Sequence, residues 1–453
     1  MKKFPERGTA ESAASFLIEK AIKRGAAAAD VLYTFNSGHS LSLLDGEPER
    51  ISSGFSLGIG LRTLDSAGRQ GVAHVNSLDR NLLDEVVEWS FSNCMSSEPD
   101  AYVALADPAP ASEEALALSD EAVLNLSPSD RMAFCREMWE TAKSADPRVV
   151  SVRSASWGDG AGEVLYASST GAMMWYEGAS AGCGVSVILS SGDSMEMGGY
   201  GDESRLLASL EPRATAVEAV RRTAMVLGGE PLPTGRYDLL LDPESSASFV
   251  EVLGELFLAS NIHKNKSFLK GKRGEKIAST ALSLVDDGTL KGGIGTAPFD
   301  GEGVPCSKTS LLSGGVVGSW LYNLKYARID GVASTGNAAR SVSGTPDVDF
   351  SNLSLLPGKW TPQDLMLQVG SGILVTELLG LHTMNPVSGD FSLGIKGVRI
   401  KDGSLAEPVA GMTVAGNLKD VLRSIDLVGN DFKFFGSIGS CSLVIRDVAA
   451  AGT

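Results

Sequence analysis

Four stretches of the chain place apolar residues on one side of a helix, at intervals of three or four positions. The predicted helices cover residues 11–24, a stretch that starts near residue 76 or 77, residues 127–144 and residues 210–227. In the second helix, Leu82, Val86 and Trp89 form the apolar side. Ser127 or Ser129 can cap the third, since a serine hydroxyl accepts from the free N–H groups of a first turn. We expect these helices to be buried on one side.

Between the helices, apolar and β-branched residues alternate with polar ones, at the period of two expected of a strand with one buried face. The alternation covers residues 29–75 and 149–200, and turns rich in glycine and aspartate interrupt it. We therefore predict an antiparallel meander. His39 and His74 fall on its strands, where we interpret them as packed or surface residues, because neither has a second ligand at metal spacing.

A segment rich in glycine and proline, residues 228–235, is typical of an interdomain linker. After it, residues 236–241 predict a short buried strand and residues 245–262 a single helix. The rest of the chain is rich in glycine and contains several strand-like runs, which predicts a heavily turned, mainly antiparallel sheet structure.

These elements predict an α+β fold of two domains. The N-terminal domain, residues 1–227, combines a sheet with helices and has a possible sub-boundary near residues 100–128. The C-terminal domain, residues 236–453, is β-rich and mainly antiparallel.

Composition adds limits on partners and location. A net charge of −16 over 453 residues opposes general attraction to nucleic-acid phosphates or anionic lipid. The five cysteines are scattered and form no CxxC pair, which argues for reduced thiols rather than disulfides or a zinc ribbon. Charged residues interrupt the first apolar run before it could serve as a signal peptide or a membrane span. We predict a cytoplasmic protein without a membrane partner.

One basic segment departs from this acidic background. Residues His263–Lys276 hold six Lys or Arg in fourteen positions, but glycines interrupt them and Phe268 is the segment's one aromatic residue. We interpret the segment as a solvated loop rather than a nucleic-acid patch.

Few residues are spaced for chemistry. No two histidines lie within thirty residues of each other, and there is no nucleophile elbow, P-loop or dinucleotide fingerprint. Glu251 and Glu255 can share a helix face, which we interpret as solvated. Residues 285–305 gather four carboxylates that favour turns, although they could also hold a divalent cation: Asp286, Asp287, Asp300 and Glu302.

The segment Leu381–Gly397, LHTMNPVSGDFSLGIKG, places a histidine close to an aspartate. Pro386 and Gly389 prevent a regular helix, so His382 and Asp390 could meet only across a turn. Such a pair could orient an imidazole as a base, but no serine or cysteine nucleophile is identifiable beside it.

Four motifs occur in the order and spacing of the TldD/PmbA proteins, which the chain resembles over nearly its whole length. They are VDDGTLKGGIGTAPFDGEGVP (285–305), ASTGNAAR (333–340), TELLGLHTMNPVSGDFSLGIKG (376–397) and VAGNLKDVLRSIDLVGND (414–431). The resemblance implies a two-domain α+β protein in a dimeric assembly.

Within that family, TldD-type subunits carry an HExxxH helix that binds a catalytic zinc together with a later cysteine. The corresponding segment here, residues 241–256, contains no histidine. The chain therefore resembles a PmbA/TldE-type subunit, and we assign it no catalytic residue, no metal ligand and no cofactor. Cys441 lies in the region of the family's cysteine ligand, but a lone thiolate would bind zinc poorly.

The resemblance implies a non-metal subunit that pairs with a TldD-type subunit, or with a second copy, and acts on unfolded or short peptides. His382, Asn385 and Asp390 then become a structured turn or a peptide-contacting wall. Two alternatives stay open: a regulatory binding protein, following the family's older description as a modulator of DNA gyrase, and a peptidase in its own right.

Overall fold

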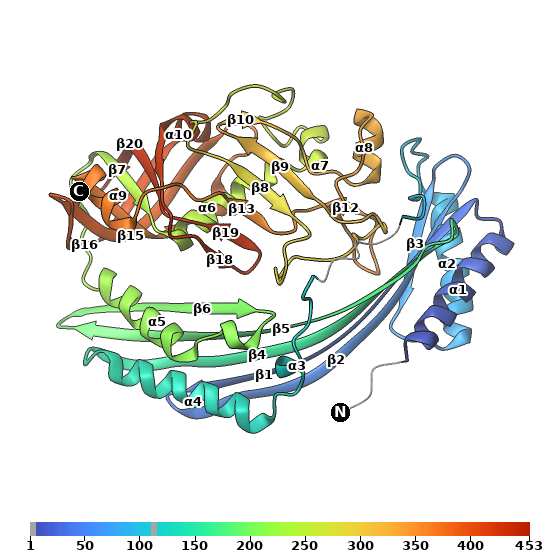
Figure 1. The fold of residues 1–453 in the computed structure, drawn as a ribbon, viewed down its shortest axis with the longest axis horizontal. Helices are drawn as coiled ribbons and strands as arrows, with labels where there is room; N and C mark the ends of the chain where they lie inside the picture. The colour runs from blue at the N-terminus through green and yellow to red at the C-terminus, as the bar shows by residue number, and fades with distance from the viewer. Residues whose placement is uncertain (1–5, 110–115) are drawn as a thin grey trace.

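The computed structural model describes residues 6–109 and 116–453 (Figure 1). Residues 110–115, within the predicted sub-boundary near residues 100–128, lie outside the described residues. The N-terminal half forms a six-stranded antiparallel sheet in the order β3-β2-β1-β4-β5-β6. Its strands are β1 (Ala28–Leu44), β2 (Glu47–Leu64), β3 (Gln70–Val75), β4 (Val149–Ser168), β5 (Met173–Ser191) and β6 (Ser194–Ser204). The predicted meander is thus confirmed, and Figure 1 shows it as a long curved band beneath the C-terminal half.

Helices cover one face of this sheet. They are α1 (Arg7–Arg24), α2 (Arg80–Ser96), α3 (Glu121–Leu124), α4 (Pro128–Ala145), the 3-10 turn η1 (Leu207–Ser209) and α5 (Pro212–Val226). Odd-numbered residues of β1 face them: Tyr33 and Phe35 pack in the core near α1 and α2, and Leu41 and Leu43 in the core near α4. Because neighbouring residues of a strand point to opposite faces, the even-numbered residues of β1 point away from these helices.

The apolar side predicted for α2 is wrong. Leu82 and Trp89 are exposed, whereas Leu83, Val86 and Val87 are buried. Helix α4 follows the prediction: Ser127 caps it, and its hydroxyl accepts from Asp130 N.

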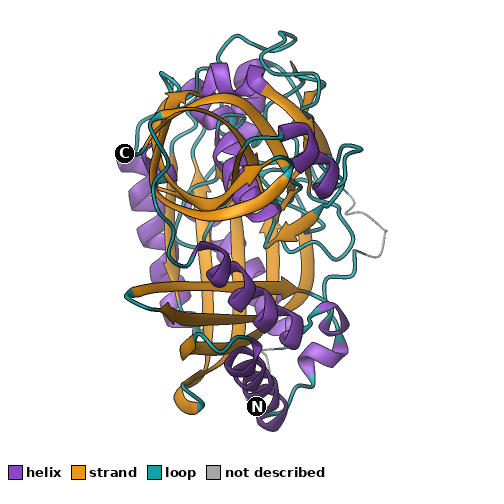
Figure 2. Ribbon diagram, turned by 90° about the vertical axis from the view of Figure 1, so that its left-hand side faces the viewer, coloured by secondary structure: helices purple, strands orange, loops and turns teal. Residues whose placement is uncertain are grey.

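The C-terminal half contains two six-stranded sheets, ordered β16-β15-β14-β7-β20-β17 and β10-β9-β8-β13-β19-β18. In the first, β16 also pairs with β20, and Figure 2 shows the strands curling into a ring. The main strands are β7 (Gly235–Leu241), β14 (Gly372–Leu379), β15 (Asp390–Lys401), β16 (Ser404–Asn417), β17 (Ile425–Val428) and β20 (Leu443–Ala451). The second sheet contains β8 (Leu284–Asp287), β9 (Lys308–Ser313), β10 (Val316–Val317), β13 (Leu353–Leu355), β18 (Lys433–Phe435) and β19 (Ile438–Ser440). A separate two-stranded pair consists of β11 (Ala338–Ala339) and β12 (Asp347–Val348).

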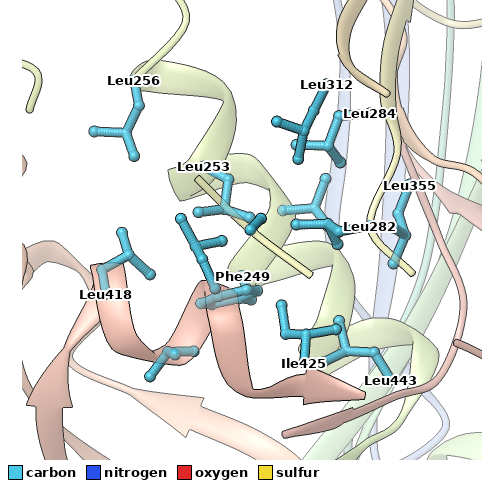
Figure 3. Packing of buried hydrophobic residues seen from close by; sticks show 14 of the residues in the cluster. Phe249, Leu253, Leu256, Leu282, Leu284, Leu312, Leu355, Leu418, Ile425 and Leu443 are labelled. Carbon is cyan, nitrogen blue, oxygen red and sulfur yellow. The ribbon is translucent and has the colours of Figure 1, made fainter. Parts of the chain in front are cut away.

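Helix α6 (Pro243–Glu255) lies between these two sheets and carries much of the C-terminal core. Phe249 and Leu253 pack from it against residues of both sheets, among them Leu284 and Leu443 (Figure 3). The other helical segments are α7 (Ala259–His263), α8 (Leu324–Asp330), α9 (Pro362–Val369), η2 (Leu381–Thr383) and α10 (Leu418–Ser424).

The single helix predicted over residues 245–262 is wrong, because the chain leaves helical geometry between α6 and α7. Leu258 is extended and forms a bridge with Leu321. The mixed α+β class is as predicted, and the C-terminal sheets are mainly antiparallel, with β7–β14 and β13–β19 as parallel pairs. Among the described residues, no helix is both long and apolar enough to cross a membrane.

Candidate functional site

A cleft separates the middle of the N-terminal sheet from the C-terminal half. Its cavity has a volume of about 570 Å³, and Glu244 and Phe435 of the C-terminal half line it opposite the sheet. Even-numbered residues of β4 and β5 form the floor: Ser156, Gly158, Gly160, Ser180, Gly182 and Gly184. No side chain in this set is larger than that of serine, so the floor presents mostly backbone.

A second cavity, of about 230 Å³, lies beside the first at the start of helix α6. Residues from β6, α5, α6 and β14 line it, and Glu244 lines both cavities. We call this smaller cavity the α6 pocket. Glu244 is thus the residue common to the linings of both cavities.

The local sequence explains why α6 begins here. Strand β7 runs directly into Asp242, whose carboxylate accepts from Ser245 N at 2.9 Å and so caps the helix. Pro243 follows at the first helical position, where its missing N–H costs nothing. Glu244 and Ser245 are therefore fixed in the first turn, at the edge of the α6 pocket.

Arg222 of helix α5 holds the two halves together at this point. Its guanidinium pairs with Asp242, lies 2.9 Å from a Glu244 carboxylate oxygen and donates to Thr376 O at 2.7 Å. Burial raises the pKa of Glu244, and nearby Arg222 offsets part of this rise. On the other side of the pocket, Lys396 pairs with Glu196 at 2.8 Å and with Glu377 at 3.5 Å.

The α6 pocket does not fit the zinc site of a TldD-type subunit. The corresponding segment, residues 241–256, holds three glutamates and no histidine, so no placement of the HExxxH pattern on one of these glutamates provides a histidine ligand. Beside Glu244, Arg222 already supplies a fixed positive charge. The described residues contain no group of three His, Cys, Asp or Glu able to hold a metal ion.

The structure makes Cys441 a core residue. It is fully buried, and burial raises the pKa of its thiol to about 12. A thiol that keeps its proton at neutral pH is a poor metal ligand and a poor nucleophile. Cys94, Cys135 and Cys183 are buried as well, and Cys306 is half-buried.

At the opposite end of the sheet, four charged side chains close the contact between the two halves. Asp30 and Arg62 come from the N-terminal sheet, and Glu302 and Arg340 from loops of the C-terminal half. Arg62 pairs with Asp30 at 2.6 Å and lies 3.6 Å from Glu302, while Arg340 pairs with Asp30 at 2.8 Å. We call these four residues the charge cluster.

The acidic segment 285–305 serves turns and buried contacts. Asp300 accepts from the backbone N–H of Glu302, Val304 and Ala338, and Asp286 from that of Ser351 and from the Asn337 side chain. Asp287 accepts from Thr289 in a turn. The turn interpretation agrees with the local contacts of Asp287 and Asp300, whereas Asp286 lies in strand β8 and makes buried contacts with distant residues.

The turn that contains His382, Asn385 and Asp390 lies on the surface, and all three residues are exposed. Asn385 Oδ1 accepts from Val387 N and Ser388 N, and Asp390 accepts from the Asn417 side chain at 2.8 Å. His382 lies in η2, one element after β14, whose residues 376–378 line the α6 pocket. The turn thus has the hydrogen bonds of a rigid structural element, while its contact with a peptide stays a prediction.

Sequence reasoning missed Arg222, Glu244 and Ser245 as site residues. Glu251 and Glu255 are exposed, as expected, but Glu244 on the same helix faces the cleft. The available signal was the Asp242–Pro243 pair directly after a buried strand, which places a helix start at a sheet edge.

Comparison with known proteins agrees with this architecture. Models of one family match three consecutive parts of the chain: PmbA/TldA metallopeptidase domain 1 at residues 29–94, the central domain at 121–227 and the C-terminal domain at 234–452. Metalloprotease PmbA of Escherichia coli O157:H7 is 24% identical over 448 residues, which cover 99% of this chain and 97% of that protein.

Solved structures show the same fold. A Thermotoga maritima protein, described as a candidate modulator of a DNA gyrase, is 26% identical with a TM-score of 0.89, over 97% of this chain and 100% of that one. TldE from Thermococcus kodakarensis is 23% identical with a TM-score of 0.88 and the same coverage. Because the three models follow one another over most of the sequence, the chain belongs to the PmbA/TldD family.

Proposed function

We propose that this chain is a PmbA/TldE-type subunit that holds extended peptides for cleavage by a metal-containing TldD-type partner. The observation that carries the proposal is the start of helix α6. The segment that corresponds to the family's zinc motif, residues 241–256, contains no histidine, and Arg222 stands beside Glu244 in its first turn. The subunit contributes a binding surface, and the partner contributes the metal-activated water.

The cleft supports the peptide part of the proposal. Its floor of glycine and serine lets another backbone approach β4 and β5 closely, since these positions of the two strands carry no bulky side chain. Strand β6 is the last strand of the N-terminal sheet, and its residues Glu196–Gly199 line the α6 pocket. An extended peptide can add to such an edge by main-chain hydrogen bonds, which suit substrates of varied sequence.

The test compares the chain alone with a mixture. Purified chain is assayed for bound zinc and for cleavage of an unfolded peptide, first alone and then with a TldD-type partner. We expect cleavage only in the mixture, and none when the partner's motif histidines are changed to alanine. Cleavage by the lone, zinc-containing chain would overturn the proposal.

A steric variant tests the cleft itself. Gly158 has room for a Cβ, with His39 O at 3.8 Å as the nearest neighbouring atom, so Gly158→Leu attaches a bulky side chain to the floor at a position where the Cβ meets no clash. We expect at least about tenfold slower cleavage in the mixture, because the added side chain holds the peptide away from the sheet. Gly54→Leu, on an exposed part of β2, is the matched control and should cleave normally.

The second candidate function, modulation of DNA gyrase, rests on the description of the Thermotoga maritima relative and on the basic segment His263–Lys276. Residues 270–276 are exposed, yet Lys264 pairs with Asp347 and Lys272 with Glu275, which weakens a phosphate-binding role. Changing the segment's lysines to glutamate should leave association with gyrase and DNA unchanged. A loss of such association would favour this second function.

A further inference from the structure

The α6 pocket carries more negative than positive charge. Three carboxylates line it, those of Glu196, Glu244 and Glu377, and Arg222 is the one cation in its lining. Outside the lining, Asp242 pairs with Arg222, and Lys396 pairs with Glu196 and Glu377. Glu377 is about half exposed and lies 3.5 Å from Lys396, a looser contact than the 2.8 Å between Lys396 and Glu196. The pocket can therefore accept one more cationic group.

A second observation points to a ligand that forms hydrogen bonds. Ser245 lines the pocket and is only 3% exposed, and its hydroxyl oxygen has no hydrogen-bond partner among the described residues. A buried hydroxyl without a partner costs free energy, which a bound donor would recover. Asp242 already caps the first turn of α6, so its charge offsets the positive end of the helix dipole.

The size and position of the α6 pocket limit which ligands it can hold. A volume of about 230 Å³ is smaller than the sites that enclose drug-sized ligands, and suits the end of a chain. Exposed Met197 of β6 lines the same pocket, and a flexible thioether accommodates side chains of varied shape. Glu244 lines both this pocket and the glycine-rich cleft.

We propose that the α6 pocket binds a primary ammonium group of an extended peptide, with Glu244, Glu377 and the Ser245 hydroxyl as acceptors. This inference rests on the proposed function, because it assumes a peptide in the cleft. Two sources supply this chemistry, the peptide's N-terminal amine and a lysine side chain, and each is a separate arm of the test.

The experiment measures fluorescence anisotropy of labelled eight-residue peptides with the purified chain. One pair of peptides has a free or an acetylated N-terminus and contains no lysine. A second pair is acetylated and carries either lysine or norleucine at its second position. We expect removal of the recognised amine to weaken binding at least about tenfold, the effect of losing one charge-assisted hydrogen bond.

Substitutions of residues that line the α6 pocket test whether this loss of binding arises there. Glu244→Gln and Ser245→Ala should weaken binding of the amine-bearing peptide and leave its blocked counterpart unchanged. Glu251→Gln makes the same change at an exposed position of the same helix and should have no effect. Circular dichroism of each variant checks that the fold is retained.

The outcomes separate the two proposals. The ammonium site is overturned if amine-bearing and blocked peptides bind equally in both pairs, or if Glu244→Gln affects both members of a pair equally. Either result leaves the peptide-holding function standing. Failure of every peptide to bind, together with normal cleavage by the Gly158→Leu mixture, overturns both.

Discussion

Arg340 and Asp30 stand 310 positions apart, yet the Arg340 guanidinium donates to the Asp30 carboxylate at 2.8 Å with both side chains fully buried. Asp30 is the third residue of the long β1 strand, and Arg340 directly follows β11 in the C-terminal half. The contact therefore joins the two halves of the chain at a point from which water is excluded.

Replacing Arg340 by methionine should lower the free energy of unfolding by about 3–5 kcal/mol, because Asp30 would keep Arg62 as its one cation. Burial alone would raise the pKa of Asp30, but Arg340 and Arg62 more than offset it, and the pKa lies below its usual value. This stabilisation is therefore present above about pH 4 and is lost as pH falls through the lowered pKa. Urea denaturation at pH 7 and pH 3 checks both points.

The matched control is Arg399→Met, which breaks an ion pair with Glu407 whose side chains are both more than one third exposed. Exposed pairs contribute about 0–1 kcal/mol. Similar losses for the two variants would show that the charge cluster adds nothing beyond an ordinary surface pair.

Gly60→Ala should destabilise the same contact sterically. A Cβ at Gly60 would come within 1.9 Å of the carbonyl oxygen of Val342, so the loop after Arg340 must move away from β2. We expect a loss of about 1–3 kcal/mol, as for overpacking in a core. Gly54→Ala on the same strand meets no atom within 4 Å and should be neutral in the same thermal denaturation assay.

Glu163→Gln should stabilise the protein at alkaline pH. Glu163 is 6% exposed, and burial, with a contribution from Glu177 across the strand pair, raises its pKa to about 7. A carboxyl with a raised pKa keeps its proton on folding, so its effect on stability worsens as pH rises from about 4 to about 7. We expect a gain of roughly 1–2 kcal/mol at pH 8 and little change at pH 5. A difference independent of pH would contradict this account.

Substitutions in the turn around Asn385 distinguish a structural role of the turn from a peptide-contacting role. Asn385→Ala removes the acceptor of two backbone N–H groups, so hydrogen exchange at Val387 and Ser388 should accelerate about tenfold, equivalent to about 1.4 kcal/mol of local stability. His382→Ala should leave exchange unchanged. If all three variants, with Asp390→Ala as the third, preserve assembly and partner-dependent cleavage, the turn has no peptide-contacting role.

The period of apolar residues was sufficient to predict the elements, but not always their buried side. In α2, Leu82, Val86 and Trp89 have helical spacing, and so do Leu83, Val86, Val87 and Ser90. The two sets share Val86, and only the packing against β3 decides between them. Likewise, the apolar pattern continues from α6 into α7, while the bridge of Leu258 to distant Leu321 interrupts the helix.

The charge cluster and the α6 pocket were harder to predict, because both combine residues far apart in sequence. Asp30 and Arg62 occupy alternating strand positions, where a charged side chain usually indicates a solvated face. Their burial depends on a loop from the C-terminal half, which no local pattern reveals. Glu244 lies on one helix with exposed Glu251 and Glu255, and only Arg222 of α5 distinguishes its surroundings.

The pairing of β1 with β4 limits how the chain can be divided. The first family model ends at residue 94 and the second begins at residue 121, but fourteen residue pairs, from Asp30–Ser168 to Leu43–Ala155, join β1 to β4 across that gap. A fragment that ends between residues 94 and 121 would expose this whole ladder as an open sheet edge, which is prone to aggregation. We therefore expect that the N-terminal half must be produced as one piece, because each of its helix-covered ends would otherwise lose the strand that its own outer strand pairs with.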